Sequence, residues 1–290
     1  MYTMRPAEFD YHRPGSLDEA LALLGSGEES RPLAGGHSLL PLMKLRLSTP
    51  SALVELAGVP GLDEIAEDGD GLRIGALATH ASVASSELVR SRCPVLAETA
   101  ALIGDAQVRN RGTLGGSVAH ADPAADYPTV LTALGATIVV AGQDGERDVS
   151  ADDFFVDMFT TALQPGELVV AAKVPAMLAG TAAAYEKHRH PASFYAVVGV
   201  AAVVSVENGT CTSARVTIGG VAGTPVDATA AAESLSGAPP TEAAAATAAE
   251  KVAEALPNAT GDTYASAEYR VHLATVLAKR ALAKVFERAS

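Results

Sequence analysis

Two glycine-rich segments hold the residues of this chain that are best suited to binding a ligand. The first reads Leu33-Ala34-Gly35-Gly36-His37-Ser38-Leu39, and the second reads Thr113-Leu114-Gly115-Gly116-Ser117. Glycine has no side chain, so paired glycines let peptide N–H groups point at a ligand, and the flanking hydroxyls add donors. Runs of such N–H groups bind anions. The two segments therefore predict a site for a pyrophosphate group.

Neither segment matches the other common phosphate motifs. The chain has no G-x-G-x-x-G of a Rossmann turn and no G-x-x-x-x-G-K-[ST] of a P-loop. A single Gly-Gly pair is commonly just a tight turn, and this alternative stays open for each segment taken alone. Two pairs with matching hydroxyl neighbours, about 80 residues apart, favour a ligand.

Composition excludes several classes of function. The 290 residues include 34 acidic and 21 basic side chains, for a net charge of −13, which repels nucleic-acid phosphates at long range. No apolar run approaches the ~20 residues of a membrane span. Cys93 and Cys211 are too few to bind iron–sulfur clusters, and His120 with Asp122 lacks a third ligand for a metal.

The segments that must position these residues fall into three regions. Ser16 and Glu19 have the spacing of a capping box and predict a helix from residue 17, with short strands at 31–34 and 52–56. The sequence pattern changes near residue 60, where the second region begins. The middle region, 59–178, combines the following expected elements: strands at 72–77, 136–141 and 166–174; two helical pieces in 81–103, broken at Pro94; a polar glycine-rich passage at 104–126; and a helix at 127–134.

The last region, 179–290, is expected to form an antiparallel sheet followed by helices. Strands are predicted at 182–187, 196–207 and 214–218, with a turn at Asn208-Gly209, and helices are predicted within 228–255 and 269–289. Strands followed by helices indicate an α+β fold.

Longer stretches around both glycine pairs resemble one protein family. Residues 34–47, AGGHSLLPLMKLRL, and residues 110–128, NRGTLGGSVAHADPAADYP, resemble the two flavin loops of the FAD-binding medium subunits of molybdenum hydroxylases. The carbon monoxide dehydrogenase branch is the most similar, and the xanthine dehydrogenase flavin domain is more distant. The resemblance covers essentially the whole chain. It implies a two-part FAD-binding domain at 1–178, with subdomains 1–58 and 59–178, and a C-terminal domain at 179–290.

The resemblance also assigns cofactor contacts. Amides of both glycine loops cradle the FAD pyrophosphate, the Asp126 carboxylate accepts from ribose or ribityl hydroxyls, and the Lys187 cation and the Tyr195 ring lie near the flavin. Ile103 and Leu163 add apolar or backbone contacts. The implied FAD-binding residues are Leu33, Ala34, Gly35, Gly36, His37, Ser38, Leu39, Ile103, Thr113, Leu114, Gly115, Gly116, Ser117, Asp126, Leu163, Lys187 and Tyr195.

Structural alternatives stay open for several of these residues. Asp126 is also placed to cap the helix that begins at Tyr127. Lys187 is equally compatible with a solvated surface lysine, Leu163 with a core leucine, and Tyr195 with an ordinary strand aromatic. His37 is read as a hydrogen-bonding loop residue. The family often has Asn at the positions of Ser117 and His120, so individual contacts can differ there.

The implied function is electron transfer rather than substrate oxidation, with no catalytic residue and no metal on this chain. A large partner with a molybdenum cofactor oxidises the substrate, and a small partner with two 2Fe–2S clusters passes electrons to FAD on this chain. An external acceptor such as a quinone then takes them.

The expected assembly is a dimer of heterotrimers in the cytoplasm, with attachment at the inner face of the membrane left open. Carbon monoxide is the leading substrate; purines, N-heterocycles and aldehydes stay open. The alternatives are a stand-alone FAD oxidoreductase and a non-catalytic nucleotide-binding module.

Overall fold

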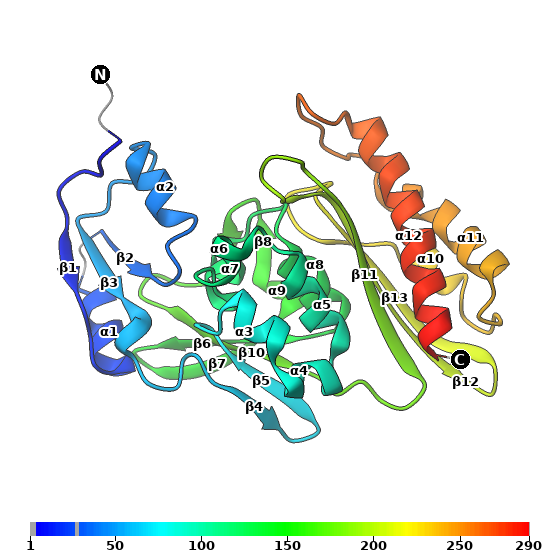
Figure 1. Ribbon diagram of the computed structural model, residues 1–290, viewed down its shortest axis with the longest axis horizontal. Coiled ribbons are helices and arrows are strands. Elements are labelled where there is room, and N and C mark those ends of the chain that lie inside the picture. The colour runs from blue at the N-terminus through cyan, green and yellow to red at the C-terminus, as the bar shows by residue number, and fades with distance from the viewer. Residues whose placement is uncertain (1–3, 27–28, 290) are drawn as a thin grey trace.

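The N-terminal region is built on a small parallel sheet. The computed structural model describes residues 4–26 and 29–289, and its first three strands pair in the order β1-β3-β2, both pairs parallel (Figure 1). The first glycine segment follows the end of β2. The elements are β1 (Asp10–His12), α1 (Leu17–Leu24), β2 (Ser30–Leu33), α2 (Leu39–Lys44), β3 (Ala52–Glu55) and the short 3-10 helix η1 (Leu56–Gly58).

The predicted capping box at α1 is confirmed. The Ser16 hydroxyl accepts a hydrogen bond from the Glu19 amide at 3.2 Å, and the Glu19 carboxylate accepts one from the Gly15 amide at 2.8 Å. These bonds satisfy amides that a helix N-terminus leaves without partners.

Replacing Ser16 with alanine should lower the free energy of unfolding by about 1 kcal/mol, because the cap loses its side-chain acceptor. Urea denaturation followed by circular dichroism measures the change. An unchanged midpoint would show that this hydrogen bond adds no net stability.

The middle region holds an antiparallel sheet in the order β4-β5-β10-β6-β7, packed on both faces. Ile138 and Val140 face the core formed with the helices, and Val139 and Ala141 face the core shared with α1 and β3, as the two-residue period of a strand requires. The elements are β4 (Ile65–Asp68), β5 (Gly71–Gly75), α3 (His80–Ser85), α4 (Glu87–Arg92), α5 (Pro94–Leu102), α6 (Ala106–Arg109), α7 (Leu114–His120), α8 (Asp126–Ala133), β6 (Thr137–Gly142), β7 (Gly145–Ser150), α9 (Ala151–Phe154), β8 (Phe155–Asp157), β9 (Thr160–Thr161) and β10 (Leu168–Val174).

The C-terminal region is an antiparallel sheet in the order β11-β12-β13-β14, with α12 lying across β11 and β12 (Figure 1). Asn208 and Gly209 both have positive φ, 51° and 74°, which confirms the predicted hairpin turn. The opposite face of the sheet packs on the middle region, where Ala183, Tyr185 and Ala201 join the core around α8. The elements are β11 (Thr181–Arg189), β12 (Ala196–Glu207), β13 (Thr210–Gly219), β14 (Val226–Asp227), α10 (Thr229–Glu233), α11 (Glu242–Glu250), the 3-10 helix η2 (Lys251–Ala255) and α12 (Ala267–Ala289).

This architecture confirms the α+β fold and corrects two local expectations. Residues 81–103 form three helices rather than two, because Ser86 ends α3 with extended backbone and then caps α4. The passage at 104–126 contains α6 and α7, so the second glycine pair lies inside the first turn of a helix rather than in a loop. Within the described residues, no helix combines the length and the apolar character needed to cross a bilayer.

Candidate functional site

The two glycine segments are far apart in sequence and meet in space. A Cβ atom placed on Gly35 would lie 2.8 Å from the Cα of Gly112 and would also collide with the Arg111 carbonyl. Gly116 faces Ala34 across the same contact, with 3.8 Å between an added Cβ and the Ala34 Cβ. Gly35 is therefore required for the close approach of two backbones. Both segments contribute to one site.

The first segment presents a run of peptide N–H groups. The amides of residues 35–38 donate to no backbone carbonyl within the described part of the chain, whereas within α2 the Leu40 amide donates to the Gly36 carbonyl at 3.1 Å and the Leu42 amide to the Ser38 carbonyl at 3.2 Å. Gly36 has a φ of 75°, the left-handed conformation that favours glycine. Successive N–H groups of this kind form an anion-binding nest.

The second segment differs from the expected cradle of peptide groups. The amide of Leu114 donates to Ala78 O at 2.9 Å, that of Gly115 to Ala76 O at 2.8 Å, and that of Gly116 to the Thr113 hydroxyl at 3.1 Å. Gly115 is needed for packing, because its added Cβ would lie 2.7 Å from the Ala76 Cα. These partners occupy the amides of residues 114–116, so the Thr113 amide and the hydroxyls of Thr113 and Ser117 are the polar groups left for a ligand.

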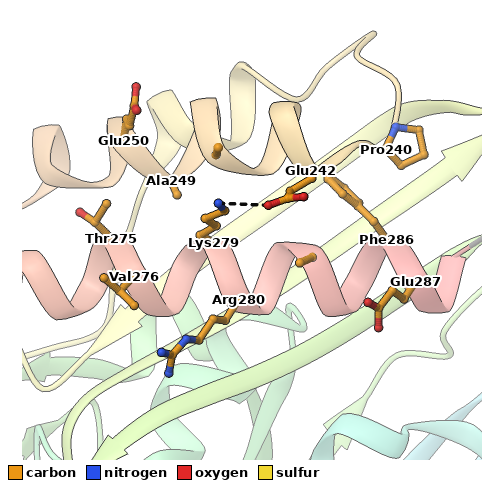
Figure 2. Close-up of a pocket in the computed structure, with 12 residues that line it drawn as sticks. Pro240, Glu242, Ala249, Glu250, Thr275, Val276, Lys279, Arg280, Phe286 and Glu287 are labelled. Atoms are coloured by element: carbon orange, nitrogen blue, oxygen red, sulfur yellow. Dashed lines mark ion pairs between the residues drawn. The ribbon is translucent and has the colours of Figure 1, made fainter.

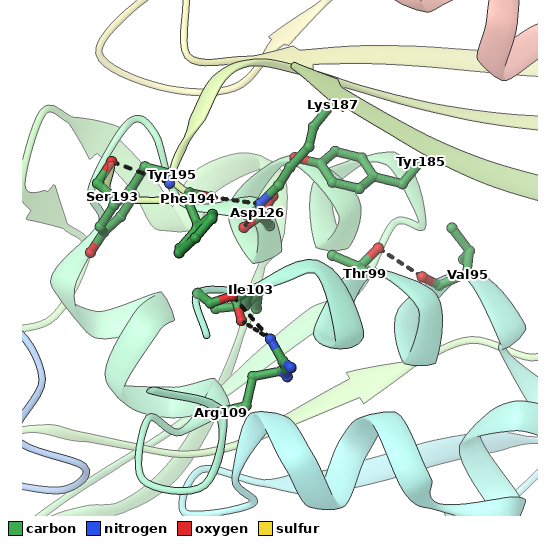
Figure 3. A network of polar contacts seen from close by, with 11 residues as sticks. Val95, Thr99, Ile103, Arg109, Asp126, Tyr185, Lys187, Ser193, Phe194 and Tyr195 are labelled. Atoms are coloured by element: carbon green, nitrogen blue, oxygen red, sulfur yellow. Dashed lines mark hydrogen bonds and ion pairs between the residues drawn. The ribbon is translucent and has the colours of Figure 1, made fainter. Parts of the chain in front are cut away.

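A buried ion pair lies next to the site and joins the middle and C-terminal regions (Figure 3). Lys187 Nζ lies 2.9 and 3.0 Å from the two Asp126 carboxylate oxygens, and Tyr185 donates to the same carboxylate at 2.7 Å. The Lys187 and Asp126 side chains are 3 % and 4 % exposed. Burial raises the pKa of Asp126 above its usual range, and the Lys187 cation and the Tyr185 hydroxyl oppose that shift in part.

This ion pair rules out the structural alternatives that the sequence left open for Asp126 and Lys187. Asp126 is not a helix cap: Ala125 occupies the cap position of α8, and the Asp126 carboxylate points to Lys187. Lys187 is not a solvated surface lysine. The cation that was expected near the flavin is neutralised by a carboxylate.

Lys187 also anchors the turn that carries Tyr195. Its ammonium group donates to the Phe194 carbonyl at 3.0 Å, and Phe194 has a φ of 60°, a strained conformation for a bulky residue (Figure 3). Tyr195 precedes β12, so the expectation of an ordinary strand aromatic is wrong. Burial and Asp122 raise the pKa of Tyr195, and a hydrogen bond with Ser38 partly opposes them. Tyr195 thus connects the C-terminal region to the first glycine segment.

The remaining predicted residues have mixed surroundings. Ile103 and Leu163 are partly buried against the core of the middle region, and the Ile103 carbonyl accepts a hydrogen bond from Arg109 at 3.0 Å (Figure 3). Leu33 ends β2, Leu39 begins α2, and His37 is exposed on the loop between them. Their contacts with a cofactor stay predictions.

Sequence reasoning missed two residues of this region. Nothing in the sequence indicated that Tyr185 would be a partner of Asp126, 59 residues away. His80 was not singled out, although its ring lies against Gly112. Only the long-range packing of β11 and α3 reveals these contacts.

A separate groove lies on the outer side of the C-terminal region (Figure 2). It has a volume of about 780 Å³ and runs between α11 and α12, where Lys279 pairs with Glu242 at 3.3 Å. The glycine segments lie away from this groove, at the end of β2 and at the start of α7 near the middle of the molecule (Figure 1). Among the described residues, no group of three or more His, Cys, Asp or Glu side chains could hold a metal ion.

Comparison with known families accounts for this arrangement. Residues 7–177 match the model of the FAD binding domain in molybdopterin dehydrogenase, and residues 183–285 match that of the CO dehydrogenase flavoprotein C-terminal domain. The chain belongs to the FAD-binding subunits of the molybdopterin dehydrogenases. In this family it is a flavoprotein subunit of an oxidoreductase.

Similar members of the family cover the full chain. The carbon monoxide dehydrogenase medium chain of Afipia carboxidovorans is 39 % identical over 99 % of both chains, and the 6-hydroxypseudooxynicotine dehydrogenase complex subunit alpha of Paenarthrobacter nicotinovorans is 38 % identical over 99 % of this chain and 97 % of the relative. Among solved structures, carbon monoxide dehydrogenase from Hydrogenophaga pseudoflava has a TM-score of 0.94 at 41 % identity, covering 99 % of this chain and 100 % of that one.

Proposed function

We propose that FAD binds where the first glycine segment, the second segment and the Tyr195 turn meet. The observation that carries this proposal is the run of four peptide N–H groups at residues 35–38, which donate to no backbone carbonyl of the described chain. A diphosphate supplies the acceptors that these groups lack. The hydroxyls of Thr113 and Ser117 add donors from the facing segment. The residues present therefore fit the cofactor of the family.

The chain's own groups orient the cofactor and set the local field. When bound, FAD supplies a centre that exchanges electrons singly or in pairs. The N–H groups of residues 35–38 hold a diphosphate without a basic surface, which suits a chain with a net charge of −13. The Lys187 ammonium group is paired with the Asp126 carboxylate and donates a hydrogen bond to the Phe194 carbonyl. Its role is to fix the turn, and through the turn to place the Tyr195 ring at the edge of the site.

We propose that iron–sulfur and molybdenum centres lie on partner subunits. Both cysteines are buried, and burial raises the pKa of Cys93 to about 12, so that this thiol is unsuited to ligation as a thiolate. A small subunit with 2Fe–2S clusters would deliver electrons to this chain, and a large subunit with a molybdenum cofactor would oxidise the substrate. The complex would be a dimer of heterotrimers that reduces a quinone, in the cytoplasm and peripheral to the inner face of the membrane.

The substrate is determined by the large subunit in this proposal. The relatives at 39 % and 38 % identity are named for carbon monoxide and for 6-hydroxypseudooxynicotine. One medium-chain architecture thus serves different substrates. Carbon monoxide is the first candidate to test, followed by N-heterocycles, purines and aldehydes.

Purification of the chain from its native host tests the proposal. We expect a yellow complex of three kinds of subunit that releases FAD on denaturation, with the visible flavin absorbance bleached when the substrate of the large subunit is added. Two results would contradict the proposal: a chain that is always isolated alone, and a complex whose iron–sulfur signal is reduced by substrate while the flavin stays oxidised.

A further inference from the structure

His80 lies beneath the point where the two glycine segments meet. It is the first residue of α3, and its side chain is buried, with the residue 4 % exposed. The His80 amide donates to the Gly112 carbonyl at 2.9 Å, and the preceding Thr79 forms a β-bridge with Thr113. The main chain at His80 thus holds the main chain of the second segment.

The His80 ring also fills the space next to Gly112. A Cβ added to Gly112 would lie 2.6 Å from Nε2 of His80, and a Cβ added to Gly35 would lie 2.8 Å from the Gly112 Cα. The Nε2–Cδ2 edge of the His80 ring therefore borders Gly112, and Gly112 in turn borders Gly35. In a close-packed interior, the atoms of this ring edge limit how far Gly112 can move away from Gly35.

The surroundings keep this ring neutral. Burial is the main cause that lowers the pKa of His80 to about 4, and His37 from the first segment and Arg109 from α6 add to it. The Tyr127 ring of α8 packs against it, with ring centroids 5.3 Å apart. Within the described residues, Nδ1 of His80 and the Tyr127 hydroxyl have no hydrogen-bond partner. The neutral ring therefore offers Gly112 the contact of its Nε2 edge, while its Nδ1 makes no hydrogen bond within the described residues.

We propose that His80 is a positioning residue: its ring holds the Arg111–Gly112 backbone against Gly35 and so keeps the N–H groups of residues 35–38 in the geometry that binds the diphosphate of FAD. This inference rests on the proposed function. His80 acts through Gly112 rather than on the cofactor.

The test measures FAD affinity of the full chain by flavin fluorescence titration, with the fold of each variant checked by circular dichroism. His80→Ala should weaken binding about tenfold, a difference of about 1.4 kcal/mol. His80→Phe should bind nearly as the wild type, because its ring places atoms where the Nε2 edge of His80 meets Gly112. His272→Phe, at an exposed position of α12, is the matched control and should have no effect. If His80→Ala does not fold, His80→Leu, which has no atom at the position of Nε2, takes its place with the same expectation.

A double variant separates positioning from general stability. Gly35→Ala pushes the first segment off Gly112, and His80→Ala makes room for Gly112 to retreat, so the double variant should lose less affinity than the product of the two single losses. Tight binding by His80→Ala, weak binding by His80→Phe, or fully multiplicative losses would overturn the inference. If His80→Ala binds tightly while Gly35→Ala binds weakly, only the role of His80 fails; absence of FAD binding by the wild type would overturn both proposals.

Discussion

Gly35→Ala should weaken FAD binding by about 10- to 100-fold, because overpacking of this kind costs roughly 1–3 kcal/mol. The added Cβ would lie 2.8 Å from the Gly112 Cα and collide with the Arg111 carbonyl, and both are backbone atoms that cannot rotate away. The first segment must then move off the second, and the N–H groups of residues 35–38 move with it. FAD retained after gel filtration and the fluorescence of released flavin measure the effect.

Gly15→Ala is the matched control for this change. Its added Cβ would meet only a Glu19 carboxylate oxygen at 3.9 Å, an ordinary contact. It should bind FAD as the wild type does. If Gly35→Ala bound FAD as tightly as Gly15→Ala does, the contact between the two segments would have no part in holding the cofactor.

Lys187→Met should lower the free energy of unfolding by about 3–5 kcal/mol, because it leaves the Asp126 carboxylate buried without its cation. The midpoint of thermal unfolding should fall by roughly 10 °C. The same change at Lys173 is the control: that residue pairs with Asp148 at 2.8 Å, but its side chain is 37 % exposed, and such pairs contribute about 1 kcal/mol or less. Equal losses at the two lysines would contradict the account.

The loss in free energy of unfolding caused by Lys187→Met should depend on pH. Burial already raises the pKa of Asp126 above 3.8 in the wild type, and loss of the cation raises it further. The folded variant then binds a proton more readily than the unfolded chain does, so its stability rises as pH falls. The loss in free energy of unfolding relative to the wild type should therefore be larger at pH 8 than at pH 5. Asp126→Asn combined with Lys187→Met should recover part of the loss at pH 8, since it removes the uncompensated charge.

Local signals in the sequence predicted the elements that depend on neighbouring residues. The Ser16 capping box and the Asn208-Gly209 turn act within four residues, and both were correct. Strand β7 was missed because its sequence, GERDVS, is polar and exposed except at Val149, so it shows no apolar alternation. The helix α7 was missed because two glycines lower its helical propensity, and tertiary bonds to Ala76 and Ala78 override that preference.

The site was predictable only in part, for the same physical reason. The glycine segments are contiguous and readable, and their contact in space was inferred from their matching patterns. Which amides stay without partners depends on the fold around them: α7 donates its amides to the 76–78 segment, whereas the loop at 35–38 does not. The Asp126–Lys187 pair spans 61 residues, and no sequence period connects them.

Hydrogen exchange at residues 35–38 tests the central claim most directly. These amides donate to no backbone carbonyl of the described chain, so they should exchange rapidly in the FAD-free protein. Addition of FAD should slow them strongly, while the amide of Gly115, already bonded to Ala76 O at 2.8 Å, changes little. If the protein binds FAD and exchange at residues 35–38 stays as fast as before, the diphosphate lies elsewhere and the proposed site is wrong.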